Sequence, residues 1–199
     1  MNRDRGYTLL ELMLVVLLIG ISMALAMPSI STAMAEQTQS NASLSVLDVF
    51  RTARSRAIQS GAPTLVLATA APSGEFWILQ APQTPGVVVG CSSVNWVALA
   101  GLQQIPLNTV LNFDDLAADE EWNAFGINVI FNGGAGTPGV CYTPLGRVYY
   151  SANGAAGPFS DAQGAAPGGA LTIGVRRTQN AITRDVVVPL GSGMPRLGN

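Results

Sequence analysis

The chain has 199 residues, of which 48% are hydrophobic and 11% are charged, whereas about 25% of the residues of an average soluble protein are charged. Lysine and histidine are absent, and ten arginines face twelve acids for a formal net charge of −2. Without histidine there is no Ser-His-Asp or Cys-His nucleophile pair and no HExxH zinc site, and without lysine there is no Walker loop or Schiff base. The composition argues against a conventional enzyme and predicts neither a cofactor nor a metal site.

Much of the apolar excess lies in residues 7–27, where Glu11 is the single charge. A helix of this length spans about 31 Å, which is the thickness of the hydrocarbon core of a bilayer. Arg3 and Arg5 precede the run, and the next positive charge is Arg51. The positive-inside rule therefore predicts one membrane crossing with the N-terminus in the cytoplasm and the remaining residues on the other side.

A secretory signal peptide is the alternative interpretation, because the triplets at 24–26 and 33–35 resemble signal peptidase sites. Glu11 argues against it. A carboxylate at membrane depth costs roughly 2.5–3.5 kcal/mol on insertion scales and is usually kept for a function. A signal peptide that is removed has no use for such a residue.

Residues 5–13, RGYTLLELM, followed by an apolar helix, resemble the N-terminus of type IV pilins and type II secretion pseudopilins. The resemblance implies that residues 1–6 are a leader, that a prepilin peptidase cleaves after Gly6 on the cytoplasmic side, and that the new N-terminus at Tyr7 is N-methylated. The apolar segment stays in the mature chain, where Glu11 occupies the fifth position. The implied fold is the α+β pilin fold, in which a long N-terminal helix packs on an antiparallel β-sheet head.

The position of Glu11 suggests a role in assembly. If such helices pack side by side, a buried carboxylate needs a cation, and leader cleavage creates one as the α-amino group of Tyr7 in a neighbouring subunit. Neutralisation between chains would then fix the axial register of an incoming subunit, much as a buried polar residue fixes register in coiled coils.

A second helical segment is predicted over residues 29–61. Pro28 ends the apolar run, because a proline inside a helix removes a hydrogen bond and kinks or interrupts the helix. Beyond it, apolar residues recur at spacings of three and four, which predicts an amphipathic helix that Gly61 ends. The residues assigned to its apolar face are Met34, Leu44, Leu47, Phe50, Ala53, Ala57 and Ile58.

Residues 62–199 are expected to form a β-rich periplasmic head. Short runs rich in β-branched residues, separated by turn signals, predict strands at 64–69, 75–80, 87–91, 94–99, 108–112, 127–132, 147–151, 171–177 and 183–189. Two stretches, 71–74 and 132–139, have the composition of hairpin loops. The Gly/Ala/Pro-rich stretch 154–169 is expected to be a flexible surface loop.

Two further segments are similar to the GspH/FimT group of this superfamily. Residues 50–61, FRTARSRAIQSG, resemble the helix end that leads into the first strand of that group, and residues 186–191, VVVPLG, resemble its last strand. FimT-type proteins implicated in DNA uptake often carry a Gly-Arg-x-Arg signature near the C-terminus. Residues 193–196, GMPR, keep only its glycine and second arginine, and this departure argues against DNA binding.

Cys91 and Cys141 are the only cysteines of the chain. The predicted topology places both in an oxidising compartment, which favours a disulfide over the alternative of two buried thiols. Closing a loop of about 50 residues would contribute roughly 4 kcal/mol on the chain-entropy model.

Two charged groups are candidate binding sites. The acidic run of Asp114, Asp115, Asp119, Glu120 and Glu121 lacks the alternation and central glycine of an EF-hand loop, so a solvated loop or short helix is favoured over a calcium site. Four C-terminal arginines are possible DNA contacts, because guanidinium groups bind phosphates, but surface solubility is the simpler interpretation. These arginines are Arg176, Arg177, Arg184 and Arg196.

The sequence therefore predicts a structural subunit of the inner membrane, a minor pilin or GspH-like pseudopilin, rather than an enzyme. Its expected partners are a prepilin peptidase and the other pilins of a type IV pilus or type II secretion pseudopilus. A FimT-like DNA-binding minor pilin and a secreted β protein with a signal peptide are the alternatives. The sequence does not distinguish pilus from secretion system, or a major from a minor subunit.

Overall fold

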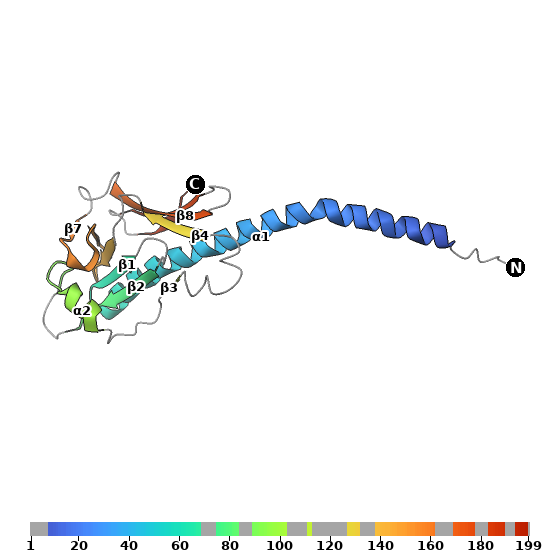
Figure 1. Cartoon of the computed structure of the whole chain (residues 1–199). Coiled ribbons are helices and arrows are strands. Elements are labelled where there is room, and N and C mark those ends of the chain that lie inside the picture. Colours follow the sequence, from blue (N-terminus) through green and yellow to red (C-terminus); the bar gives the residue numbers. More distant parts are fainter. Residues whose placement is uncertain are drawn as a thin grey trace. The chain divides into compact units, whose positions relative to one another are not determined.

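The structure, a computed structural model, describes residues 8–68, 75–83, 89–102, 111–112, 127–131, 138–161, 169–177, 183–189 and 194–198. The chain divides into two compact units, Met1–Gln37 and Thr38–Asn199. Helix α1 (Leu9–Ser60) begins in the first unit and ends in the second, which also holds the strands (Figure 1). The chain has the α+β architecture of a pilin fold, with an N-terminal helix packed on antiparallel sheets.

Helix α1 is continuous over its whole length, so the interruption considered at Pro28 is absent. Its end agrees with the prediction, because Gly61 adopts a φ of 66°, a conformation that is strained for residues with a side chain. The Ser60 hydroxyl then accepts a hydrogen bond from the Ala62 backbone amide at 3.3 Å, which directs the chain into the first strand.

The predicted apolar face of this helix is correct in part. Leu47, Phe50, Ala53 and Ala57 are buried, as expected. The other three predicted residues, Met34, Leu44 and Ile58, are 53%, 48% and 48% exposed. The packed face is instead completed by Gln39, Ala42, Ser43, Val46 and Val49.

A polar residue accounts for part of this difference. The Gln39 side-chain amide donates a hydrogen bond of 2.9 Å to the Val175 backbone carbonyl, so it is buried with a partner. The face that packs on the sheets therefore begins with a glutamine, which a search for apolar periodicity does not detect.

The strands form two antiparallel sheets. Sheet A has the order β3-β2-β1-β5-β6-β7, and sheet B has the order β10-β9-β8-β4. The strands of sheet A are β1 (Thr64–Ala68), β2 (Glu75–Gln80), β3 (Leu111–Asn112), β5 (Gly139–Tyr142), β6 (Val148–Ser151) and β7 (Ser160–Asp161). Those of sheet B are β4 (Ile127–Phe131), β8 (Ala170–Arg177), β9 (Thr183–Pro189) and β10 (Arg196–Leu197).

The main core lies between α1 and both sheets. Phe50 of α1 is fully buried and meets Phe76 of β2 edge to face, with ring centroids 6.0 Å apart. Sheet B contributes Ile173 and Val186 to the same cluster. Burying a side chain of this size contributes about 1.5–3 kcal/mol, so this cluster is the main source of stability of the second unit.

The other face of sheet A is covered as well. Alternate residues of β1 enter different clusters: Val66 packs with α1, whereas Leu65 packs with Cys91, Cys141 and Trp96. The strand is therefore buried on both faces, which explains why TLVLA is a continuous apolar run rather than an alternating one.

Six of the predicted strands agree with observed ones to within a residue at each end, namely β1, β2, β4, β6, β8 and β9. In the predicted strand 108–112, residues 111–112 form β3, and residues 108–110 lie outside the described residues. The predicted hairpin loop at 71–74 also lies outside them. The prediction at 87–91 is wrong for residues 89–91, where a turn is closed by the Ser93 amide donating to the Gly90 carbonyl at 3.1 Å.

The prediction of a strand at 94–99 is wrong, because these residues lead into helix α2 (Trp96–Leu102). Asn95 starts it as an N-cap: its side-chain oxygen accepts a hydrogen bond from the Ala98 amide at 3.1 Å. The signal was visible in the sequence as an asparagine before a short run containing alanine and leucine. The tryptophan and valines of the run suggested β-structure instead.

Strand β5 was missed and lies at the centre of sheet A. Its first residue, Gly139, belongs to the stretch 132–139, for which the composition predicts a hairpin loop, and this prediction is wrong at Gly139. A Cβ added there would lie 3.0 Å from the Gly154 backbone, so the glycine permits a close approach of two chain segments rather than a turn. The stretch 154–169 is likewise more ordered than predicted where it is described, because it contains η1 (Gly154–Ala156) and β7.

Candidate functional site

The first unit exposes a helix surface that is almost entirely apolar. Between Leu9 and Leu25, every large hydrophobic side chain is 47% to 77% exposed. These residues are Leu9, Leu10, Leu12, Met13, Leu14, Val15, Val16, Leu17, Leu18, Ile19, Ile21, Met23 and Leu25. A contiguous apolar surface of this kind marks a site of association with protein or membrane.

The start of α1 is built around Thr8 and Glu11. The Thr8 hydroxyl and carbonyl oxygens both accept hydrogen bonds from the Glu11 backbone amide, at 3.3 and 3.1 Å. Thr8 is thus the N-cap, and Glu11 stands at the third helical position, where an acid is favoured by the helix dipole. Its side chain is exposed and forms no ion pair with any described residue.

Ser22, a polar residue within the apolar segment, forms its hydrogen bond within the helix. The Ser22 hydroxyl donates a hydrogen bond of 2.8 Å to the Leu18 carbonyl, one turn earlier. The hydroxyl therefore needs no water, and the helix surface around it is compatible with an apolar environment. Glu11 is left as the one charged side chain of this surface within residues 8–25.

Gly6 and Tyr7, the predicted cleavage and methylation residues, lie outside the described residues. Both lie within the segment that a comparison with known proteins matches, and their individual roles stay predictions. Residues 1–27 match the prokaryotic N-terminal methylation motif. This match supports a type IV pilin-like prepilin N-terminus.

Beyond this motif the comparisons are negative, because neither the curated proteins nor the solved structures contain a match to this chain. The GspH/FimT assignment stays a prediction. In the part of the chain that the structure describes, no helix combines the length and apolarity needed to cross a membrane.

The predicted disulfide is present, and it joins Cys91 to Cys141. Cys141 lies on β5, whereas Cys91 lies in the turn before α2, so the bond ties this turn to the centre of sheet A. Trp96 reinforces the connection, because its indole nitrogen donates a hydrogen bond of 2.8 Å to the Cys91 carbonyl. Burial of Cys91, Cys141 and Trp96 in one cluster indicates a structural role for the disulfide.

The C-terminal arginines do not form one described surface. In sheet B, Arg184 lies opposite Val175 and therefore shares its face of the sheet. Arg176 follows Val175 in β8, so its side chain projects from the other face. Arg176 and Arg184 thus lie on opposite faces of the sheet. The Arg184 guanidinium points to α1, where it donates a hydrogen bond of 3.4 Å to the Ser40 hydroxyl. Arg196 lies on the edge strand β10, and the side chain of Arg177 lies outside the described part of the chain.

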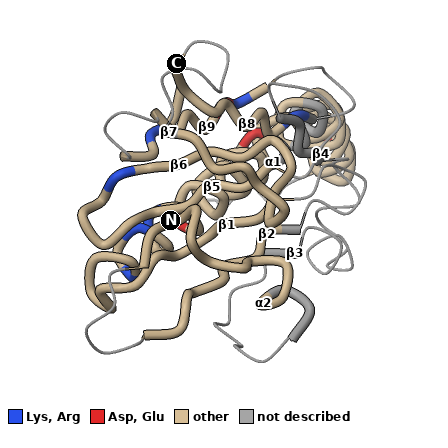
Figure 2. Tube along the Cα trace, turned by 90° about the vertical axis from the view of Figure 1, so that its left-hand side faces the viewer, with Lys and Arg blue, Asp and Glu red and all other residues tan. Residues whose placement is uncertain are grey.

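The positions of the basic residues along the chain agree with this arrangement. Figure 2 shows the described basic residues at separate places on the chain rather than in a single patch. A nucleic-acid surface needs several cations aligned along a phosphate backbone. The acidic run 114–121, considered as a calcium loop, lies outside the described residues.

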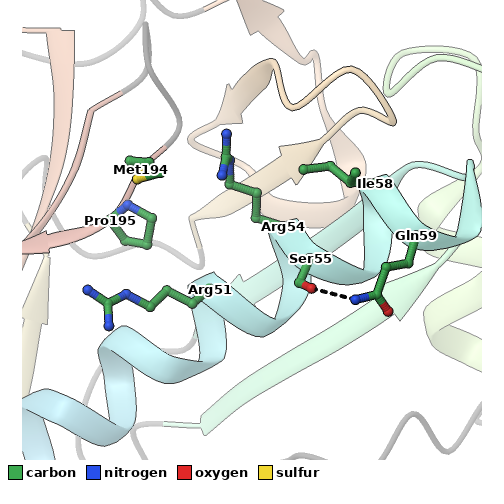
Figure 3. A pocket seen from close by; sticks show the side chains of 7 residues that line it. All are labelled: Arg51, Arg54, Ser55, Ile58, Gln59, Met194 and Pro195. Carbon is green, nitrogen blue, oxygen red and sulfur yellow. Dashed lines mark hydrogen bonds between the residues drawn. The ribbon is translucent and has the colours of Figure 1, made fainter.

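One group of residues was not assigned a role by the sequence. Arg51 and Arg54 of α1 line a pocket together with Met194 and Pro195, which lie far away in the chain (Figure 3). The spacing of the two arginines was visible in the sequence. The segment that closes the pocket was not, because only the pairing of β10 with β9 brings residues 194–195 beside α1.

Proposed function

We propose that the chain is a structural subunit of a type IV pilus or type II secretion pseudopilus, specifically a minor pilin or GspH-like pseudopilin. The observation that carries the proposal is the methylation motif at residues 1–27, which continues into a helix whose large apolar side chains between Leu9 and Leu25 are 47% to 77% exposed. A motif alone indicates processing, and an apolar helix alone indicates association. Together they favour a subunit that is processed and then assembled.

In this proposal a prepilin peptidase removes residues 1–6 and leaves Tyr7 as a methylated N-terminus. The segment 7–28 then serves first as an inner-membrane anchor, with the second unit in the periplasm, and later as part of a filament core. The anchor assignment rests on the apolar sequence run and on the arginines that precede it. The same surface suits both environments, because lipid tails and packed helices are both apolar.

Assembly through Glu11 is the proposed mechanism. Its carboxylate is exposed near the start of α1 and unpaired among the described residues. When helices pack together, a buried carboxylate must find a cation, and the amino group of Tyr7 in a neighbouring subunit is one that cleavage supplies. Cleavage would thereby activate the subunit for docking.

The mass of the mature N-terminus tests this proposal. We expect a chain that begins at Tyr7 and carries one extra methyl group when it is expressed together with a prepilin peptidase. A Gly6→Val variant should keep its leader. Gly20→Ala is the matched control within the same segment, because a Cβ at Gly20 meets nothing within 4 Å, and this variant should be cleaved normally.

Two results would contradict the proposal. A mature chain that begins at Met27 or Glu36 would show cleavage by a signal peptidase and would favour a secreted β protein. Normal removal of the leader in the Gly6→Val variant would show that the enzyme does not recognise this glycine.

A further inference from the structure

A pocket of about 470 Å³ lies in the second unit beside the last turns of α1. Its lining combines two guanidinium groups, from Arg51 and Arg54, with the apolar side chains of Ile58, Met194 and Pro195. Figure 3 shows both arginines extending from the helix toward the side on which Met194 and Pro195 lie. The remaining two residues, Ser55 and Gln59, are joined to each other by a hydrogen bond of 2.9 Å.

The arginines of this pocket have no ion-pair partner among the described residues. Neither Arg51 nor Arg54 forms an ion pair or donates a side-chain hydrogen bond to any described residue. The Nε of Arg54 is buried and has no acceptor, although buried polar groups in proteins normally have one. Arg51 is exposed, so it stands at the mouth of the pocket.

The residues around Arg54 pack on its guanidinium group without offering Nε a hydrogen-bond acceptor. A Cβ added at Gly146 would lie 3.4 Å from Nη2 of Arg54, so the turn between β5 and β6 packs closely on the guanidinium. The nearby Tyr142 hydroxyl is buried without a hydrogen-bond partner. Burial raises the pKa of Tyr142 well above its ordinary value and outweighs the opposing effect of Arg54, so the tyrosine stays neutral and supplies no negative charge.

The combination of unpaired guanidinium groups and an apolar lining defines the ligand. Guanidinium groups bind carboxylates and phosphates through paired hydrogen bonds. A polyanion such as DNA needs a long cationic surface, whereas this pocket holds two arginines on a chain with a net charge of −2. A single carboxylate attached to an apolar group fits both parts of the lining.

We propose that this pocket binds a carboxylate carried on an apolar group, either an acidic side chain of a neighbouring protein or a free organic acid. The carboxylate pairs with Arg51 and Arg54, and its apolar part packs against Ile58, Met194 and Pro195. The pocket lies within the second unit, so this proposal does not depend on filament assembly through α1.

Calorimetric titration of the mature chain in a non-ionic detergent tests the proposal. The probes are an acetylated, amidated hexapeptide of alternating leucine and glutamate, its leucine–glutamine counterpart, hexanoate and inorganic phosphate. We expect saturable binding of the glutamate peptide or of hexanoate and at least tenfold weaker binding of the other two. Binding of the peptide alone identifies a protein partner, and binding of hexanoate alone identifies a free acid.

Three variants locate the site. Arg51→Gln removes an exposed guanidinium without affecting the core, and together with Arg54→Gln it should weaken carboxylate binding at least tenfold. Met194→Asp places a carboxylate at the pocket from a side chain that is 63% exposed, and it should also weaken binding. Arg176→Gln removes an exposed arginine of β8 outside the pocket and serves as the matched control.

Several results would overturn the proposal. These are no saturable binding of either carboxylate, equal binding of the glutamine peptide, binding of phosphate as tight as that of the carboxylates, or equal loss of binding in Arg176→Gln. Unchanged affinity in both Arg51→Gln and Met194→Asp would place the binding elsewhere on the chain.

Discussion

The two ends of helix α1 have similar secondary structure but different surroundings. Around Leu17, in the first unit, large apolar side chains point outward on all sides of the helix. Around Phe50, in the second unit, one face of the same helix is fully buried against two sheets while Arg51 on another face is exposed. The apolar side chains around Phe50 are buried by other parts of the same chain, whereas those around Leu17 are left exposed.

This difference separates folding from assembly. An apolar side chain contributes to folding only when the chain itself removes it from water, which holds for Phe50 and not for Leu17. The apolar surface of the first unit therefore represents free energy that is available for association with a membrane or with other subunits. Substitutions in the two regions should accordingly affect different measurements.

The largest effect is expected for Glu11→Val. Insertion and leader cleavage should be intact, because the change removes a charge from the apolar segment. Filament incorporation should fall by roughly a hundredfold or more, since leaving the Tyr7 amino group unpaired in a helix bundle costs about 3–5 kcal/mol. The measurement is the amount of subunit in sheared filaments relative to membranes at equal expression. Equal incorporation of the variant would show that Glu11 does not guide docking.

A pair of substitutions in α1, one in each unit, makes the comparison directly. Phe50→Ala should lower the free energy of unfolding of the second unit by roughly 3–5 kcal/mol, because it leaves a cavity beside Phe76. Leu17→Ala should change it by less than about 0.5 kcal/mol, because Leu17 is 61% exposed. Denaturant unfolding followed by the fluorescence of buried Trp96 reports both. Similar losses in the two variants would mean that the first unit also contributes to this fold.

Removal of the disulfide should affect the second unit alone. The Cys91→Ala/Cys141→Ala double variant is expected to lose roughly 2–4 kcal/mol of unfolding free energy, because the bond closes a loop with a sequence separation of 50. Leader cleavage should be unchanged, since both cysteines are far from residues 1–27 in the sequence. Peptide mapping of the wild-type chain without reductant is the accompanying check, and recovery of free thiols from periplasmic material would contradict the disulfide.

The smallest expected effect concerns alkaline pH. Burial raises the pKa of Tyr142, and less strongly that of Tyr150, so both stay neutral in the folded state when they ionise in the unfolded chain. The contribution of these tyrosines to stability should therefore be constant below about pH 10 and should fall above it, by about 1.4 kcal/mol per pH unit for Tyr142. The chain has no lysine, which leaves few other groups to titrate in this range.

Tyr142→Phe tests this expectation. It should be neutral or slightly stabilising at pH 7, because it removes a buried hydroxyl without a hydrogen-bond partner. Above pH 10 the variant should lose less stability than the wild-type chain in the same fluorescence measurement. An identical alkaline loss in both proteins would contradict the assignment of this effect to Tyr142.

The sequence by itself determined the features that depend on local pattern. The apolar run, Glu11 within it, the end of α1 at Gly61 and the strands β2 and β9 are read from neighbouring residues, and the structure has them at the predicted positions. The cysteine pairing also followed, because only two cysteines are present and topology placed them together.

Tertiary structure decided the features that depend on distant partners. Gln39 is buried because Val175 offers it a carbonyl, and Gly139 starts a central strand because Gly154 approaches it closely. The pocket of Arg51 and Arg54 exists because the pairing of β10 with β9 brings Pro195 beside α1. Hydrogen bonds and close contacts between residues that are not neighbours in the sequence leave no periodic signal, so only the folded chain reveals them.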